Sequence, residues 1–456
     1  MPNDSMPRPD SGSHHASTTE TIPGLQVEAR WEKPLVAAND GEATLLVRVI
    51  AAADGQTEGG RAAPLDVAFV LDRSGSMHGG KLELAKEGID LAVARLRDAD
   101  RAALVVYDDQ VDTVQALEPA TPRLKASLRL ALHGIDPGGS TFLSGGWVAG
   151  CHQIAEALPF AGADDRATRI RRVILLTDGL ANVGILDPGE LARHAGELRR
   201  RGIATTTLGV GQDFDEGLLS AMAEAGGGNF QYVADPEGLR VFFAHELQEL
   251  FSVAATSFVV TLDVPSGMNA ELVSAFPVET RGSALDVAIG DLPASDEIDL
   301  LFNLRVPRGV AGDLLPVGVM ACWTDPRADA RHEIDASPDP LRRAAPGEVA
   351  AAIPDDFVVE RAARQRAAAE RRAALDLDRA GRIQESRARM VRSYDFLAAA
   401  PMTAEVRADL DETTALAFES SSSPYSSHVR KSTQYRETLR RRGRQGHDPG
   451  LGSDSR

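Results

Sequence analysis

Short apolar runs alternate with longer amphipathic segments through the middle of the chain. Four runs are rich in β-branched residues and bounded by turn residues, which is typical of buried parallel strands. The segments between them mix apolar and charged residues, and two of them begin with a capping residue followed by proline. This alternation predicts a doubly wound, mostly parallel α/β sheet. Strands are expected at 65–71, 102–107, 171–176, 203–210 and 230–233, and helices at 81–97, 122–133, 187–201 and 236–251.

A different pattern flanks this region on both sides. Apolar and polar residues alternate, as they do in half-exposed antiparallel strands, and proline and glycine separate the segments. Such short strands are typical of a β-sandwich, and neither flank is large enough to form one alone. We therefore expect a single sandwich, built from residues 23–61 and 253–325, with the α/β domain at 62–252 inserted into it. The strand patterns lie at 25–37, 41–52, 257–265, 284–292, 297–307 and 315–325.

The remainder of the chain divides by composition. Residues 326–352 are rich in Pro, Asp, Arg and Ala, and they are expected to form a linker. Alanine-rich segments with many Arg and Glu residues then predict paired helices with one charged face, which either binds a partner or only meets water. These helices are expected at 355–379, 382–399 and 403–420, within a helical region at 353–436. The polar ends at 1–22 and 437–456, the second of them basic, are expected to be disordered.

Candidate chemistry begins at the end of the first predicted strand of the α/β sheet. The segment DVAFVLDRSGSM, residues 66–77, delivers Asp72, Ser74 and Ser76 onto a tight turn before a helix. Alternate side chains of an extended or turning chain point to the same side, so one carboxylate and two hydroxyls can converge. Hard oxygen ligands of this kind suit Mg²⁺, and Mn²⁺ next. Taken alone, the spacing is also compatible with a serine-rich helix cap.

Two further segments point to the same edge of the sheet. Thr141 lies on a glycine-rich loop before a helix, and Asp178 follows another apolar strand. Ligands of open α/β sheets bind at the carboxyl ends of the strands, where these segments would meet. The five residues resemble the metal-ion-dependent adhesion site of the von Willebrand factor A (vWA) family, over roughly residues 64–252. They are Asp72, Ser74, Ser76, Thr141 and Asp178.

The resemblance implies a metal-dependent binding module. In that family the serines and threonine bind the metal largely directly, the aspartates bind it directly or through water, and a carboxylate of the partner protein completes the shell. The implied cofactor is Mg²⁺, with Mn²⁺ possible, and the implied partner is a protein offering an Asp or Glu. More loosely, the split sandwich is similar to that of bacterial vWA proteins related to calcium-activated chloride channel regulators and inter-α-trypsin inhibitor heavy chains.

A nucleotide-binding motif overlaps the same loop but is incomplete. Residues 75–81, GSMHGGK, satisfy seven places of a P-loop, whereas Leu82 stands where a Ser or Thr must hold Mg²⁺. His78 has neither a paired nucleophile nor an orienting carboxylate in view. Asp108 and Asp109 follow the second strand and either lie near the metal or are solvated loop carboxylates, the commoner case. We therefore expect no enzymatic activity from this chain.

Composition limits the remaining function classes. The 456 residues include 49 basic and 67 acidic side chains, for a net charge of −18, which disfavours nucleic acid as a partner. Arginine far outnumbers lysine, as is typical of high-GC bacterial genomes. The polar first twenty residues show no export signal and no apolar run spans a membrane, so a cytoplasmic location is expected. Cys151 and Cys322 fall in different predicted domains and are expected to be free thiols.

Two functions from different classes follow from these observations. The first is a Mg²⁺-dependent protein-binding module without catalysis. The second is a substrate-recruiting or regulatory subunit of an AAA+ ATPase or chelatase-type complex, as vWA domains are in chelatases. Since no complete nucleotide site is present here, the ATPase would be another chain.

Overall fold

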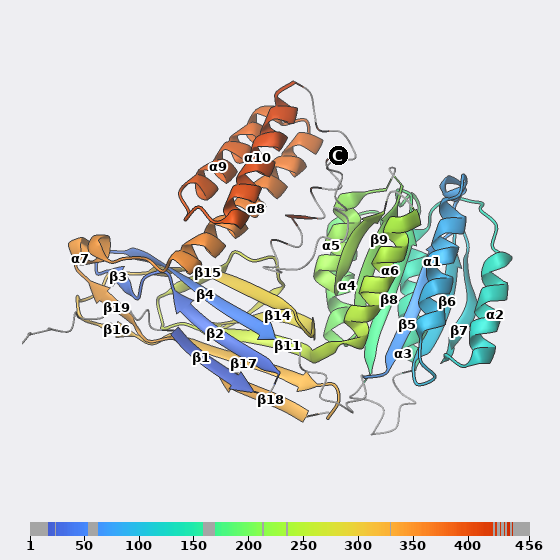
Figure 1. Ribbon diagram of the computed structural model, residues 1–456, viewed down its shortest axis with the longest axis horizontal. Helices are drawn as coiled ribbons and strands as arrows, with labels where there is room; N and C mark the ends of the chain where they lie inside the picture. Colours follow the sequence, from blue (N-terminus) through green and yellow to red (C-terminus); the bar gives the residue numbers. More distant parts are fainter. Residues whose placement is uncertain are drawn as a thin grey trace, which may run out of the picture.

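The computed structural model contains three packed parts: a sandwich, an α/β domain and a helical region (Figure 1). The residues that it describes are 17–22, 24–52, 63–157, 169–211, 214–233, 236–328 and 330–422, with 425, 429, 433, 436, 437 and 440. In Figure 1 the sandwich lies at the left, the α/β domain at the right, and the helical region above them. The predicted fold class, an α/β sheet combined with a sandwich and C-terminal helices, is confirmed.

The α/β domain is built on a six-stranded sheet in the order β10-β9-β8-β5-β6-β7. All neighbours are parallel except β6 and β7, and β7 was not expected from the sequence. The central strand is buried on both faces, which accounts for its continuous apolar run. The strands are β5 (Leu65–Asp72), β6 (Arg101–Tyr107), β7 (Val111–Pro119), β8 (Ile170–Thr177), β9 (Ala204–Val210) and β10 (Gly227–Val233).

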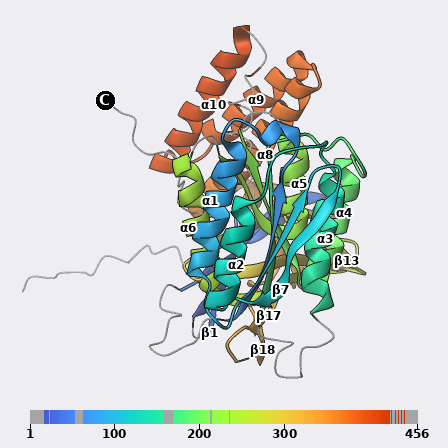
Figure 2. The ribbon, with the colours of Figure 1, turned by 90° about the vertical axis from the view of Figure 1, so that its right-hand side faces the viewer.

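Helices cover both faces of this sheet (Figure 2). Alternate residues of β5 point to opposite sides, so Phe69 packs in the core under α1, α2 and α6, and Val70 in the core under α3, α4 and α5. Thr121 and Asp187 cap α2 and α4 as their sequences predict, while α5 was not expected. The helices are α1 (Lys81–Arg95), α2 (Pro122–His133), α3 (Leu143–Glu156), α4 (Pro188–Arg200), α5 (Glu216–Gly226) and α6 (Pro236–Phe251), with a 3-10 turn, η2, at Gly75–Met77.

The sandwich joins strands from both sides of the α/β domain. Strand β4 pairs antiparallel with β15, from Ile50 opposite Glu297 to Gly41 opposite Val306. The two sheets, β1-β2-β4-β15-β12 and β13-β14-β11-β17-β18, enclose one apolar core. Their strands are β1 (Ser17–Ile22), β2 (Leu25–Trp31), β4 (Gly41–Ala51), β11 (Val253–Asp263), β12 (Asn269–Leu272), β13 (Val278–Arg281), β14 (Ala284–Pro293), β15 (Glu297–Val306), β17 (Gly318–Asp325) and β18 (Ala330–Asp335).

One side chain connects the two ends of the inserted domain. The Arg97 guanidinium donates from Nη2 to the Ala63 carbonyl at 2.7 Å, next to the start of β5. The same guanidinium lies 4.9 Å from the centre of the Phe251 ring, at the end of α6. The chain therefore enters and leaves the α/β domain at neighbouring points.

The expected linker at 326–352 is wrong. This segment forms β18, β19 (Leu341–Ala344) and α7 (Pro346–Ala351), and β19 joins β16 (Leu314–Leu315) and β3 (Leu35–Ala37) in a small third sheet. Strand β18 lies at the edge of its sheet, with most of its side chains partly or fully exposed. Its sequence is therefore polar and does not predict a strand. Its place is fixed by Ile334, which enters the core, and by His332, which stacks on Trp323.

Both ends of the chain are also more ordered than expected. Residues 17–22, expected in the disordered N-terminal tail, form β1 and pair with β2. At the other end Glu437 is fully buried, because it accepts two hydrogen bonds from the buried guanidinium of Arg371. The rest of these expected tails, 1–16, 438–439 and 441–456, lies outside the described residues.

The helical region contacts both other parts through one long helix. Helix α8 (Asp356–Arg379) begins on the sandwich, where the Phe357 ring lies 4.9 Å from the guanidinium carbons of Arg48 and Arg361. Near its other end, Arg379 Nη2 lies 3.0 Å from Asp215 Oδ1, just before α5. The charged face of α8 thus contacts the α/β domain as well as solvent. Helices α9 (Ile383–Ala398) and α10 (Ala404–Ser422) complete this region.

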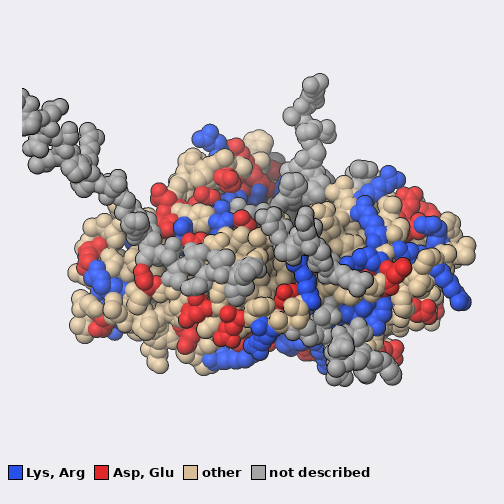
Figure 3. All heavy atoms as spheres, turned by 60° about the horizontal axis from the view of Figure 1, so that its bottom comes forward, with Lys and Arg blue, Asp and Glu red and all other residues tan. Residues whose placement is uncertain are grey.

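The surface and thiols add two observations. Basic and acidic side chains are interspersed on the face seen in Figure 3. Cys151 is buried and Cys322 is half-buried, and both thiols are free. In the part of the chain that the structure describes, no helix has the length and apolar character needed to cross a bilayer.

Candidate functional site

All five predicted site residues lie at the carboxyl edge of the central sheet. Asp72 ends β5, Ser74 and Ser76 lie on and beside η2, Asp178 follows β8, and Thr141 precedes α3. Gly179 lies in their midst, since a methyl group placed there would be 3.3 Å from Ser76 Oγ, 3.4 Å from Thr141 Oγ1 and 3.9 Å from Asp72 Oδ2. Side chains from three separate segments therefore converge, as the sequence predicts.

Asp72 is a buried and fully oriented carboxylate. Thr177 donates its hydroxyl to Oδ2 at 2.6 Å, and the Ser74 amide donates to Oδ1 at 2.7 Å. Burial raises the pKa of Asp72, the hydrogen bonds from Thr177 and Ser74 lower it, and the charge of Asp178 raises it further. The Tyr107 hydroxyl, whose own pKa burial raises well above its usual value, lies 3.4 Å from the same carboxylate.

Asp178 is equally buried and has two partners. Ser76 donates its hydroxyl to Oδ1 at 2.8 Å, and the Lys81 ammonium lies 2.6 Å from Oδ2. The Oγ atoms of Ser74 and Ser76 are 3.1 Å apart, so Asp178 is linked through two hydroxyls to Ser74, whose amide donates to Asp72. The ion pair with Lys81 was not anticipated, although this lysine is the one in the incomplete P-loop segment.

Backbone hydrogen bonds hold the surrounding loops in place. The Thr141 amide donates to Asn182 Oδ1 at 2.8 Å, and the Asn182 and Val183 amides both donate to the Thr141 carbonyl. The Gly75 amide donates to the Gly139 carbonyl at 3.1 Å, so the loop before α3 is also attached to the turn after β5. The site is therefore preformed by contacts between its loops.

The donor set fits a hard divalent cation. It offers two buried carboxylates and three hydroxyls, all oxygen, in the proportions that suit Mg²⁺ better than a metal that prefers nitrogen or sulfur. Among the described residues no group of three or more His, Cys, Asp and Glu side chains could hold a metal. Any cation at this edge of the sheet would thus depend on the serine and threonine hydroxyls.

The neighbouring titratable residues have structural roles. His78 is exposed and its Nδ1 lies 2.7 Å from the Gly75 carbonyl. Asp108, expected as a solvated carboxylate, is instead buried and accepts hydrogen bonds from the Gln110 amide at 2.8 Å and from Arg73 Nε at 3.1 Å. Asp109 is exposed and lies against Gly139. Asp108 therefore joins the loop after β6 to the turn after β5, through its hydrogen bonds with Gln110 and Arg73.

The rim of the site includes exposed apolar side chains. Leu180, Val183 and Leu186 are 54%, 40% and 51% exposed, on the loop that follows Asp178. Ala181 and Ile185, from the same loop, pack inward against the core under α3, α4 and α5. The loop that follows Asp178 therefore leaves three of its apolar side chains exposed to solvent.

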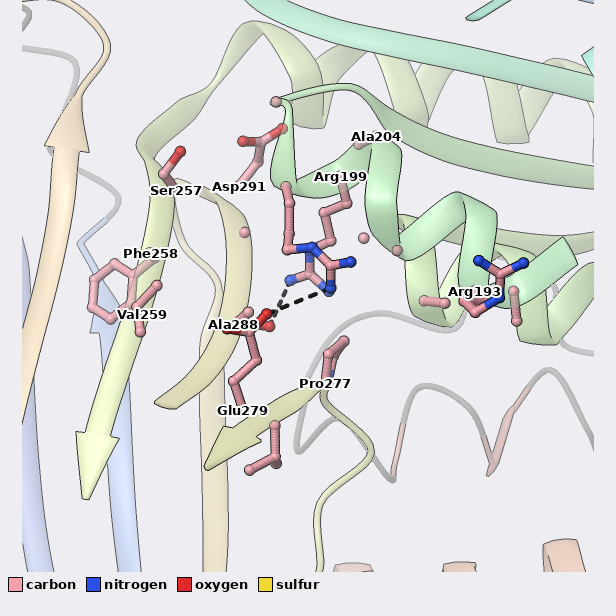
Figure 4. A pocket seen from close by; sticks show the side chains of 18 of the residues that line it. Arg193, Arg199, Ala204, Ser257, Phe258, Val259, Pro277, Glu279, Ala288 and Asp291 are labelled. Carbon is pink, nitrogen blue, oxygen red and sulfur yellow. Dashed lines mark hydrogen bonds and ion pairs between the residues drawn. The ribbon is translucent and has the colours of Figure 1, made fainter. Parts of the chain in front are cut away.

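A cavity of about 600 Å³ lies between α4 and the sandwich (Figure 4). Its arginines already have partners. Arg199 donates to the Ala288 carbonyl at 2.6 Å, and Arg200 lies 3.4 Å from Glu279, both across the boundary between the two parts. Arg193 donates to Glu197 on its own helix. These contacts make the cavity part of the junction between α4 and the sandwich.

Comparisons with known proteins agree with this fold. Residues 66–245 match the von Willebrand factor type A domain. The protein sll0103 of Synechocystis sp., itself uncharacterized, is 26% identical over 292 residues, which cover 62% of this chain and 66% of that protein. Inter-alpha-trypsin inhibitor heavy chain H3 of Homo sapiens is 30% identical over 161 residues, 35% of this chain and 18% of that protein.

Two solved structures resemble nearly the whole chain. A von Willebrand factor type A protein from Catenulispora acidiphila has a TM-score of 0.68 at 19% identity, over 88% of this chain and 90% of the other. The ArnB paralog VWA2 from Sulfolobus acidocaldarius has a TM-score of 0.63 at 18% identity, over 92% of this chain and 98% of the other. At these identities the likeness concerns the fold. The sequence relatives named above are matched over 66% or less of their own length.

Proposed function

This chain contains a von Willebrand factor type A domain at residues 66–245, and we propose that the domain binds a protein partner through a Mg²⁺ ion. The observation that carries the proposal is the convergence of oxygen donors from three segments around Gly179. The residues that would hold the ion are Asp72, Ser74, Ser76, Thr141 and Asp178. Mn²⁺, which prefers similar ligands, is the expected substitute.

The partner would contribute an Asp or Glu side chain. When bound, Mg²⁺ supplies a position that favours a hard anionic oxygen over a neutral one. The chain's own part is to hold the hydroxyls and carboxylates in place, through the hydrogen bonds that Thr177 donates to Asp72 and that the Thr141 amide donates to Asn182. The proposal assigns no catalytic step.

The apolar rim indicates what surrounds that carboxylate. Leu180 and Val183 are exposed within five residues of Asp178, and burying such side chains against a partner is favourable, at about 25 cal/mol for each Å² removed from water. We therefore expect the partner's acidic residue to lie beside an aliphatic or aromatic residue. Electrostatic attraction from the ion acts only at short range, because salt screens exposed charges beyond about 8 Å.

Thermal unfolding of the full chain, with Mg²⁺ or with EDTA, tests the metal site. At a Mg²⁺ concentration ten times the dissociation constant, mass action adds about 1.4 kcal/mol of stability. For a domain of this size that raises the melting temperature by roughly 3 to 6 °C. The Asp72→Ala variant should lose this increase, whereas Asp98→Ala, which removes an exposed carboxylate after α1, should keep it.

The comparison of variants decides the outcome. An equal response of Asp72→Ala and the unmodified chain to Mg²⁺ would show that the ion binds elsewhere. No response in any variant would remove the metal from the proposal. With a purified partner, replacing its acidic residue by the matching amide should weaken binding as much as EDTA does, and the two losses should not add.

A further inference from the structure

Lys81 occupies an unusual position for a lysine. It is the first residue of α1, where the positive end of the helix dipole makes a cation unfavourable. Its ammonium nevertheless reaches Asp178 Oδ2 at 2.6 Å, and its side chain is 26% exposed while that of Asp178 is fully buried. The contact with the buried carboxylate accounts for the placement of the lysine.

The stem of Lys81 is also accommodated by the fold. Gly211, directly after β9, has a positive φ of 76°, and a methyl group there would lie 3.0 Å from Lys81 Cε. Glycine at this position therefore leaves room for the lysine to pass between the turn after β9 and the start of α1. The ammonium is held at the metal site by its backbone surroundings as well as by its charge.

We propose that Lys81 is an internal cation that sets the Mg²⁺ affinity of this site. Without the metal, its charge compensates one of the two buried carboxylates, Asp72 and Asp178. Asp178 would hold Mg²⁺ beside the Lys81 ammonium, and the repulsion between the two positive charges would weaken the binding of the ion. This inference rests on the proposed Mg²⁺ site. It adds that one nearby positive charge lowers the affinity of that site for Mg²⁺.

The magnitude follows from the effect of one charge at short range. An opposite charge within about 4–6 Å shifts a carboxylate pKa by about one to three units, which is a tenfold to thousandfold change in proton affinity. Mg²⁺ is doubly charged and binds the same oxygen, so its affinity should change by at least the lower limit of this range, about tenfold. Removing the lysine charge should therefore tighten Mg²⁺ binding by about tenfold or more.

Calorimetric titration of the full chain with MgCl₂ tests this inference. Lys81→Met removes the charge and keeps most of the stem, and it should bind Mg²⁺ about tenfold more tightly or better. Lys81→Arg retains the charge and should stay within about threefold of the unmodified chain. Lys125→Met, which removes a lysine that binds the Leu96 carbonyl after α1, is the matched control and should also change little.

Melting temperature in EDTA gives a second measurement. Lys81→Met removes the ammonium that lies 2.6 Å from Asp178 Oδ2, so the metal-free protein should melt at a lower temperature, and saturating Mg²⁺ should restore it. If Lys81 had only a structural role, its replacement would lower the melting temperature equally with and without Mg²⁺. Should Lys81→Met fail to fold, Lys81→Gln provides the same comparison with a side chain that can still donate a hydrogen bond to Asp178.

The outcomes separate the two proposals. Equal or weaker Mg²⁺ binding by Lys81→Met, together with no binding by Asp72→Ala, would overturn the role of Lys81 and leave the metal site intact. Absence of Mg²⁺ binding in the unmodified chain and in every Lys81 variant would overturn both. Binding that appears only in Lys81→Met would support the inference in its strongest form.

Discussion

Replacing Glu437 by glutamine is expected to loosen the helical region while the vWA domain stays folded. Glu437 accepts hydrogen bonds from Arg371 Nε at 2.8 Å and from Nη2 at 3.0 Å, and both side chains are fully buried. Arg371 Nη1 also donates to Thr413 on α10 at 3.0 Å. This pair therefore ties the segment after α10 to the middle of α8.

The size of the effect follows from the burial. Removing one partner of a buried ion pair costs about 3–5 kcal/mol, because the remaining charge stays buried without compensation. Glutamine keeps the shape and one acceptor, so we expect about 3 kcal/mol for Glu437→Gln. Replacing both partners by methionine, as Arg371→Met with Glu437→Met, should recover part of that loss, because the Arg371 charge is removed as well and Arg440, which also contacts Glu437, keeps Asp409 and Glu412 as partners.

Hydrogen exchange read by mass spectrometry is the appropriate assay, because it reports each region separately. A loss of about 3 kcal/mol corresponds to roughly hundredfold faster exchange in α8, α9 and α10. Exchange in peptides from β5 and β8 should be unchanged. The control variant Asp411→Asn, which alters an exposed carboxylate, should leave exchange unchanged throughout the protein. Unchanged exchange in α8 to α10 of Glu437→Gln would refute the reasoning.

Three further predictions concern the other parts of the chain. Gly179→Ala places a methyl group 3.3 Å from Ser76 Oγ and should weaken Mg²⁺ binding severalfold in a titration, without a matching loss of stability in EDTA. Burial raises the pKa of Asp299 to about 6, against the opposing charges of Arg48 and Arg361. In the unfolded chain the pKa of this carboxyl is about 4. The free energy of unfolding should therefore fall as pH rises from about 4 to 6, and Asp299→Asn should remove that fall in urea titrations. An excised 62–252 fragment should remain soluble and monomeric, whereas deletion of 253–325 should cause aggregation in size-exclusion chromatography, because it exposes the apolar face and edge of β4.

The oxygen donors were predictable because each belongs to a local pattern. Asp72, Ser74 and Ser76 follow one another at alternate positions, and Asp178 ends an apolar run. The chain direction of parallel strands then brings these ends to one edge of the sheet. The bonds that complete the site were not predictable in this way, because the contacts of Lys81 with Asp178 and of Asn182 with Thr141 join residues far apart in the sequence.

The elements that escaped prediction share a weak periodic signal. Strand β7 is partly or fully exposed along its whole length, so it lacks the alternation by which a half-buried strand is recognised. Strands β18 and β19 are short and rich in charged residues, and β19 is held in place by strands distant in sequence. The C-terminal end was expected to be disordered because nothing in the local sequence reveals that Glu437 pairs with Arg371.

The contacts of Arg97 have a consequence for how the chain folds. During synthesis β4 is complete long before β15 exists, because its partner begins at Glu297. Pairing β4 with β15 closes a loop of roughly 245 residues, from Ala51 to Glu297. An inserted domain that has already folded shortens this loop to roughly 60 residues, because Arg97 brings Ala63 and Phe251 together. The entropy cost of closing the loop falls by about 1 kcal/mol. The inserted domain thereby acts as a folding scaffold for the sandwich, and a mutation that destabilises it would slow sandwich assembly without touching a sandwich residue.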